Sequence, residues 1–109
     1  MVKFNTNTLD SVFAALADGT RRAIVAELAS GGEMSISALA SPFPISLPAI
    51  MKHLNVLIDA GLVVREKRGR TVHCRLNVEP LGEADEWISF YQQFWASQLD
   101  SLEEFLEQT

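Results

Sequence analysis

Residues 46–61 constrain the fold most, because they predict a helix that is capped at both ends and apolar on one side. Ser46 suits the N-cap, and Pro48 falls in the first turn, where its missing N–H costs nothing. Gly61 suits the C-terminal cap. The side expected to face a core carries apolar residues at helical spacing, namely Ile50, Leu54, Leu57 and Ile58. The opposite side and its flanks carry Ala49, Lys52, His53, Asn55 and Val56. Such a helix packs on a core and leaves its other side free.

Three helices are predicted before this one. The apolar repeat of the first ends at Asp18-Gly19 and comprises Leu9, Val12, Phe13, Leu16 and Ala17. Thr20 suits the N-cap of the second helix, which ends at Gly31-Gly32. Residues 33–36 predict a short extended connector, and Ser37 suits the N-cap of a brief third helix. Prolines in the segment 41–44 end that helix, so a short linker joins helices three and four.

Two strands and a long helix are predicted after it. Residues 62–67 and 71–77 alternate as strands do, and Gly69 supplies the positive φ of a tight turn between them. Residues 80–106 keep a helical period with a heptad seam of Leu81, Ile88, Trp95 and Leu102 beside Ala84, Tyr91, Gln98 and Phe105. The fold class is therefore mostly α with a small β-hairpin, in a single domain spanning 1–109. Helices three and four form a helix-turn-helix, and the hairpin is its wing.

The charge is divided along the chain. The net charge is −5, but residues 1–45 carry −1, residues 46–78 carry +4 and residues 79–109 carry −8. Local potential decides where a polyanion docks, so the basic middle third outweighs the acidic total. With 48% hydrophobic and 21% charged residues, the chain is neither disordered nor fibrous.

These features predict that residues 35–77 read double-stranded DNA. The second helix of a helix-turn-helix lies in the major groove, and small side chains at its start let the backbone approach the bases. Three cations on a narrow hairpin turn suit a row of phosphates or a minor groove. The residues expected to contact DNA are Ser46, Leu47, Pro48, Ala49, Lys52, His53 and Asn55 in the fourth helix and Arg65, Lys67, Arg68, Arg70 and His73 in the hairpin at 65–75.

The chain resembles a known family in three fragments. They are LADGTRRAI from Leu16, SLPAIMKHLNVL from Ser46 and AGLV from Ala60, and they look like the ArsR family of bacterial winged-helix repressors. The resemblance spans about residues 9–76; Gly19 departs from it, since the family commonly has proline there. It implies a homodimer assembled through the first and last helices, binding of an inverted-repeat operator, and usually derepression by a signal.

The dimer interface expected on this basis involves the helix at about 80–107. Its residues are Leu9, Val12 and Phe13 in the first helix and Trp87, Ile88, Tyr91, Phe94, Trp95 and Leu102 in the last. The aromatic stripe could instead line a small-molecule pocket for an unknown inducer. A winged helix that docks a protein partner through its last helix is a further alternative.

Several residues leave two interpretations open. Arg21 and Arg22 could touch phosphate or form structural ion pairs with nearby acids. His53 could contact DNA or pack half-buried on its neighbours. Cys74 is interpreted as a small buried hydrophobic residue, with a redox switch as the alternative.

Other functions are not expected. Residues 33–40 carry no cysteine or histidine, and the last helix carries no histidine, so neither a metal site nor a cofactor is predicted. No nucleophile and base are paired in a recognisable motif, which argues against an enzyme. The N-terminus lacks a secretion signal, and no apolar run is long enough to span a bilayer, so we expect a cytoplasmic protein without membrane contact.

Overall fold

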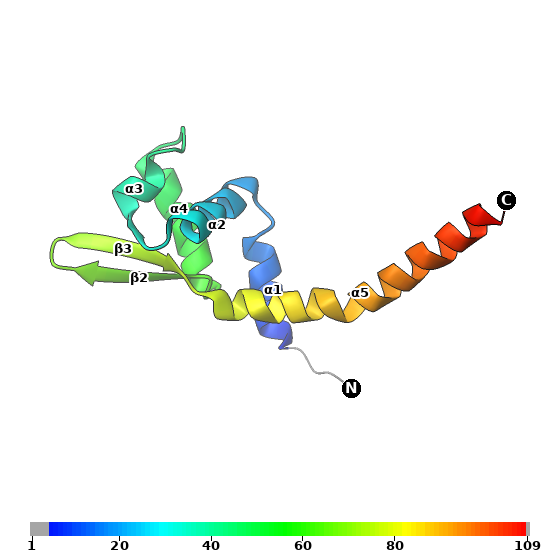
Figure 1. Ribbon diagram of the computed structural model, residues 1–109. Coiled ribbons are helices and arrows are strands. Elements are labelled where there is room, and N and C mark those ends of the chain that lie inside the picture. The colour runs from blue at the N-terminus through cyan, green and yellow to red at the C-terminus, as the bar shows by residue number, and fades with distance from the viewer. Residues whose placement is uncertain (1–4, 109) are drawn as a thin grey trace.

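The computed structural model describes residues 5–108, and its elements follow the predicted order. They are α1 (Thr6–Ala15), α2 (Gly19–Gly31), β1 (Met34–Ser35), α3 (Ile36–Ala40), α4 (Leu47–Asp59), β2 (Val63–Arg68), β3 (Thr71–Leu76) and α5 (Val78–Glu107). In Figure 1 the first four helices and the sheet gather in one body, while α5 leaves that body and ends far from it. The mostly α fold with a small hairpin sheet is therefore confirmed.

Helix α4 begins as predicted, but two of the other caps differ. The backbone N–H of Ala49 donates to Ser46 Oγ at 3.3 Å, with Pro48 in the first turn. The N-cap of α2 is Asp18 and not Thr20, because the Asp18 carboxylate accepts from the backbone N–H of Arg21 at 3.0 Å. The N-cap of α3 is Ser35 and not Ser37.

Helix α5 begins before the predicted start at residue 80. Asn77 is its N-cap and accepts from the backbone N–H of Glu79 at 3.4 Å. Pro80 therefore lies in the first turn of α5, where a proline needs no hydrogen-bond partner for its nitrogen. The cap places the start of the long helix directly after β3.

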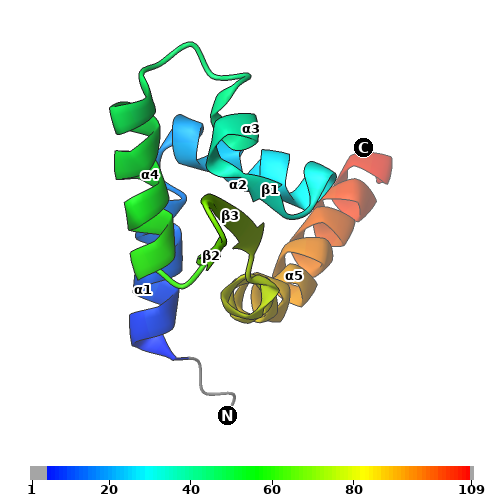
Figure 2. The same ribbon diagram turned by 90° about the vertical axis from the view of Figure 1, so that its left-hand side faces the viewer.

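The three strands form one antiparallel sheet in the order β1-β3-β2. Arg68 pairs with Thr71 across the hairpin, so the turn consists of Gly69 and Arg70 alone, one residue shorter than predicted. Gly69 has φ +62°, which a two-residue turn with glycine at its first central position requires. Figure 2 shows the sheet between α4 and the start of α5.

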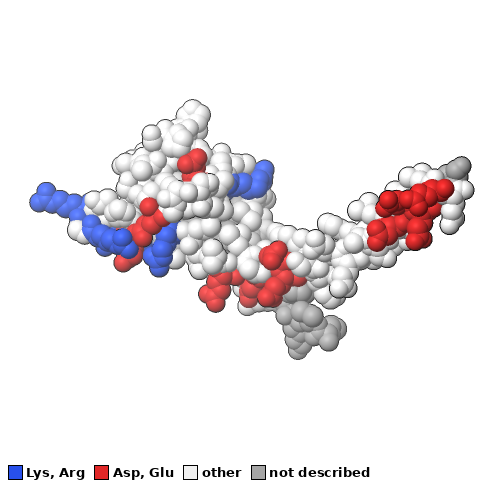
Figure 3. Space-filling view, viewed as in Figure 1, with Lys and Arg blue, Asp and Glu red and all other residues white. Residues whose placement is uncertain are grey.

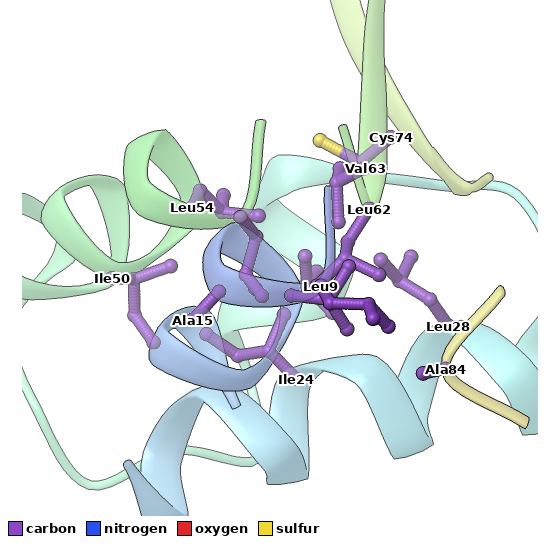
Figure 4. Close-up of a cluster of buried hydrophobic side chains, with 13 residues drawn as sticks. Leu9, Ala15, Ile24, Leu28, Ile50, Leu54, Leu62, Val63, Cys74 and Ala84 are labelled. Carbon is purple, nitrogen blue, oxygen red and sulfur yellow. The ribbon is translucent and has the colours of Figure 1, made fainter. Parts of the chain in front are cut away.

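One hydrophobic core joins all of these elements except the distal part of α5 (Figure 4). Its buried residues are Leu9, Val12, Ala15, Ile24, Leu28, Leu39, Ile50, Leu54, Leu57, Leu62, Val63, Cys74 and Ala84. Two residues predicted for the dimer interface belong to this core: Val12 is 0% exposed and Leu9 is 8% exposed within the single chain. Both side chains therefore belong to the core of the single chain, and their contact with a partner stays a prediction.

Helix α5 is buried only at its beginning. It has 30 residues, which at 1.5 Å per residue is about 45 Å. Of its described residues only Ala84 is buried, while Leu81 and Trp87 pack partly against the core beside α1. The remainder projects into solvent and gives the chain its elongated dimensions of 65 × 33 × 20 Å.

Candidate nucleic-acid interface

Helix α4 presents one open side. Ile50, Leu54 and Leu57 are fully buried, which fixes the rotation of the helix on the core. The predicted DNA-contacting residues with exposed side chains are Ser46, Leu47, Pro48, Lys52 and Asn55, and Ala49 is half-buried among them. Leu47, at the very start of the helix, is 53% exposed although it is apolar. This side therefore combines small, apolar and cationic groups at its N-terminal end, which suits contacts with base edges and phosphates.

His53 lies on the flank of α4 and faces another element of the same chain. Its Nδ1 is 3.8 Å from Asp18 Oδ1, and its side chain is 24% exposed. The hydrogen bond from the backbone N–H of Arg21, with the nearby charges of Arg21 and His53, holds the pKa of Asp18 below its ordinary value of 3.8. His53 is thus half-buried against the cap of α2, as the second of its two interpretations expects.

Arg21 and Arg22 fasten α2 to the end of α1. Arg21 Nε donates to the carbonyl oxygen of Ala15 at 2.6 Å, and Arg22 Nη1 donates to that of Leu16 at 2.7 Å. Each arginine thus satisfies a carbonyl that the end of a helix leaves without a partner. Neither forms an ion pair within 4.0 Å among residues 5–108, although the charge of Arg21 acts on Asp18, so both serve the structure through backbone carbonyls.

The hairpin carries two kinds of cation. Arg65, Lys67 and Arg70 are exposed and have no carboxylate partner among residues 5–108. Arg68, in contrast, contacts Glu33 at 2.7 Å and Glu66 at 3.2 Å. Figure 3 accordingly shows acidic atoms between basic ones over the hairpin, with basic atoms alone at its tip.

Arg75 also contacts Glu66, at 3.3 Å. The sequence alone did not single out Glu33, Glu66 or Arg75. Glu66 and Arg68 are two residues apart on one strand and share a face, which was a usable signal. Glu33 lies 35 residues from Arg68 in the chain, and no local pattern links them. The wing was therefore predicted as more basic than it is.

His73 and Cys74 lie next to each other in β3 but on opposite faces. His73 is half-buried, while Cys74 is fully buried in the core as a free thiol. Burial raises the pKa of the Cys74 thiol, an effect that the charge of Arg65 partly opposes. A neutral, enclosed thiol fits the interpretation as a small core residue. Within residues 5–108, no three His, Cys, Asp or Glu side chains are grouped as metal ligands would be.

A second surface, on α1 and α5, is apolar. Phe13 and Trp87 meet edge to face with ring centroids 5.5 Å apart, and Trp87 lies 5.0 Å from Tyr91. Beyond them the apolar side of α5 is open, since Phe94 and Trp95 are each 60% exposed. Trp87, Ile88, Tyr91 and Trp95 line a shallow apolar groove of about 300 Å³.

No helix in the described part of the chain is both long and apolar enough to cross a membrane.

The geometry defines a class of protein. A core of helices, a capped helix with one open side and a basic two-stranded hairpin packed beside it make a winged helix-turn-helix domain. The helix and the hairpin of this fold are the two parts of the basic segment 46–78 that the sequence predicts to face DNA.

Comparison with known proteins gives the family. The family described as a helix-turn-helix domain matches residues 16–66. The transcriptional repressor SdpR of Bacillus subtilis is 35% identical over 80 residues, which cover 73% of this chain and 88% of SdpR. The crystal structure of an ArsR family transcriptional regulator, RHA00566, is 38% identical with a TM-score of 0.77 and covers 89% of this chain and 98% of that one. The chain belongs to the ArsR family of winged helix-turn-helix transcription regulators.

A further solved structure bears on assembly. The DNA-binding domain of Mb0332 from Mycobacterium bovis, described as homodimeric, is 26% identical with a TM-score of 0.63. The alignment covers 80% of this chain and 82% of that domain.

Proposed function

We propose that this chain is a homodimeric repressor that binds an inverted-repeat DNA operator with α4 in the major groove and the β2–β3 hairpin as its wing. One observation carries the proposal: α4, which leaves one side open, packs beside a hairpin whose Arg65, Lys67 and Arg70 are free of carboxylates within the described chain. Phosphate contacts supply most of the affinity of DNA-binding proteins, and base-edge contacts supply specificity. The two neighbouring surfaces match these two tasks.

The contacts divide between bases and phosphates. Leu47 and Ala49 are proposed to lie against base edges, where apolar groups meet thymine methyls, and Asn55 can donate to and accept from a base. Ser46, at the helix start, suits a phosphate, as do Lys67 and Arg70 in the wing. Lys52 stands between the two groups and suits either a guanine edge or a phosphate.

The dimer is proposed to form through the apolar surface of α1 and α5. Phe13 at one end and Trp95 further along α5 are exposed on it, and the Mb0332 domain, described as homodimeric, supports the existence of a dimer. A twofold pair presents two recognition helices, so the operator half-sites should lie one helical turn apart, about 34–36 Å, or a multiple of it. Repression is proposed by analogy with SdpR, and release by an unidentified inducer remains part of the proposal.

The test begins with selection of bound sequences from a random DNA library by the purified protein. We expect an inverted repeat to emerge, and we expect affinity for it to fall steeply with salt because several phosphates are contacted. Replacing both Lys67 and Arg70 by glutamine should weaken all sequences alike, whereas Asn55→Ala should change the preferred bases. Glu27→Gln, on the exposed side of α2, is a control for an altered charge away from the hairpin.

Absence of any enriched sequence, or binding that ignores salt, would contradict the proposal. A stoichiometric protein partner with no DNA footprint would favour the alternative of an interaction module.

Because a repressor acts on the chromosome, we propose that the chain works in the bacterial cytoplasm.

A further inference from the structure

We propose that Glu33 is a positioning residue for the wing: its carboxylate holds Arg68 against the sheet and withholds it from DNA, so that Arg65, Lys67 and Arg70 make the wing's phosphate contacts. The inference rests on the proposed DNA binding and assigns a role to a residue outside the recognition helix and hairpin. It also removes Arg68 from the contacts that the sequence predicts.

Glu33 and Arg68 form a bidentate contact, in which both Nη atoms of the arginine meet both carboxylate oxygens. Arg68 Nη1 lies 2.7 Å from Glu33 Oε1, and Arg68 Nη2 lies 3.3 Å from Glu33 Oε2. Two parallel N–H···O contacts of this kind are stronger and more directional than a single one. Glu33 directly precedes β1, so the pair links the distant edge of the sheet to the end of β2.

Two further groups extend the contact into a network. Arg68 Nη2 also lies 3.2 Å from Glu66 Oε2, and Arg75 Nη1 lies 3.3 Å from the same oxygen. We call Glu33, Arg68, Glu66 and Arg75 the wing quartet. Isolated surface ion pairs contribute little, but a bidentate pair within a network of alternating charges holds its geometry better.

The wing quartet has no net charge. A phosphate that approaches Arg68 meets the two carboxylates already paired with it, and these repel the phosphate. The remaining hairpin cations are arranged differently, because Arg65 and Lys67 lie on the opposite face of β2 and Arg70 lies in the turn. The hairpin therefore has one neutral face and one cationic face with a cationic tip.

The experiment measures how much the operator affinity of the full-length protein falls between about 50 and about 200 mM salt. Each phosphate bound contributes a slope of about 0.9, so one additional phosphate bound by each wing of a dimer increases this fall roughly tenfold. Glu33→Gln frees Arg68 and should increase the fall by up to that factor. The double variant Glu33→Gln, Arg68→Gln leaves the wing quartet neutral and should behave like the parent. Arg70→Gln removes one phosphate-binding cation from each wing and should reduce the fall roughly tenfold.

Two results would overturn the inference. One is a salt dependence of Glu33→Gln equal to or weaker than that of the parent. The other is a double variant whose salt dependence is reduced as much as that of Arg70→Gln, since this would mean that Arg68 contacts phosphate in the parent. Glu27→Gln removes the same charge from α2 and should leave the salt dependence unchanged.

A measurement without DNA separates this inference from the proposed function. In ¹⁵N NMR of the free protein, the bidentate contact should slow rotation of the Arg68 guanidinium and give resolved Nη–H signals that Glu33→Gln abolishes. If these signals are present but no DNA binds, the pair exists and the proposed function fails. If DNA binds and the signals are unaffected by Glu33→Gln, the proposed function stands and the role of Glu33 fails.

Discussion

Helices α4 and α5 carry similar amphipathic patterns but have different surroundings. The apolar residues Ile50, Leu54 and Leu57 of α4 are fully enclosed by the rest of the chain. Those of α5 beyond Trp87 meet solvent, and Trp95 is 60% exposed. An apolar stripe therefore indicates that a helix packs on something, without saying whether that surface belongs to the same chain. In α5 the open stripe is the surface on which the proposed dimer partner packs.

The two helices also differ in charge. Around α4 and its hairpin the chain has a net positive charge, while residues 79–109 contain eight acids and no lysine or arginine. Figure 3 shows acidic atoms over the far end of α5 and basic atoms over the hairpin at the opposite end of the molecule. A polyanion is thereby attracted to one end and repelled from the other, which is how we expect the protein to be oriented on its proposed DNA operator.

The largest expected effect tests the enclosed helix. Leu54→Ala leaves a cavity in the core under α4 and should lower the free energy of unfolding by about 2–5 kcal/mol. Urea unfolding followed by circular dichroism at a fixed protein concentration measures the change. Val56→Ala, on the exposed side of the same helix, is the matched control and should change stability by less than about 0.5 kcal/mol. Equal losses of stability in both variants would show that Leu54 and Val56 are similarly buried, which contradicts the side of α4 that the structure turns toward the core.

The next effect tests the open helix. Trp95→Ala should weaken self-association by about 2 kcal/mol, roughly thirtyfold in the dimer Kd, because a large aromatic side chain no longer packs on the partner. Sedimentation equilibrium over a range of concentrations measures the Kd. Gln93→Ala, exposed on α5 and outside the apolar stripe, should leave the Kd unchanged. A parent protein that stays monomeric at micromolar concentration would contradict a dimer formed through this stripe.

A smaller loss of stability is expected at Cys74, where the strand β3 of the hairpin packs into the core. Cys74→Ser replaces a fully buried thiol by a hydroxyl without a hydrogen-bond partner and should lower the free energy of unfolding by about 1.5 kcal/mol. Cys74→Ala, which removes the sulfur without adding a polar group, should cost less. Chemical denaturation of the two variants measures the difference. A serine variant at least as stable as the alanine variant would mean that water or a polar group reaches this position.

Local signals in the sequence were sufficient for much of this arrangement. Ser46, Pro48 and the apolar spacing of α4 act within a few residues of each other, so they predicted both ends and the buried side of the helix. Neighbouring candidates for a cap were harder to separate. Ser35, and not Ser37, caps α3 because Met34 and Ser35 pair with β3, which fixes where the extended chain ends.

Contacts between distant residues could not be predicted. The pairing of Glu33 with Arg68 depends on how the sheet closes, and the carbonyls that Arg21 and Arg22 reach depend on the angle between α1 and α2. The sequence marked Leu9 and Val12 as apolar and helical but offered no means to distinguish a core contact from an interface contact. The residues proposed to contact DNA lie on exposed or half-exposed surface, and their roles stay predictions until DNA binding is measured.

The smallest effect concerns the cap beside α4, where Asp18 accepts from Arg21 and faces His53. Because the pKa of Asp18 is lowered in the folded chain, its charged form stabilises the fold above the unfolded pKa, and this contribution is lost as pH falls through the lower, folded pKa. Asp18→Asn keeps a good N-cap but cannot titrate, so any advantage of the parent in Tm should be constant near neutral pH and should shrink below about pH 4. Thermal unfolding from pH 7 to pH 3 measures it, with Asp10→Asn, an exposed change on α1 away from any cap, as the control. A difference in Tm that grows as the solution is acidified would show that the Asp18 carboxylate is not stabilised by this cap, and the link between α2 and the flank of α4 would have to be assigned to other contacts.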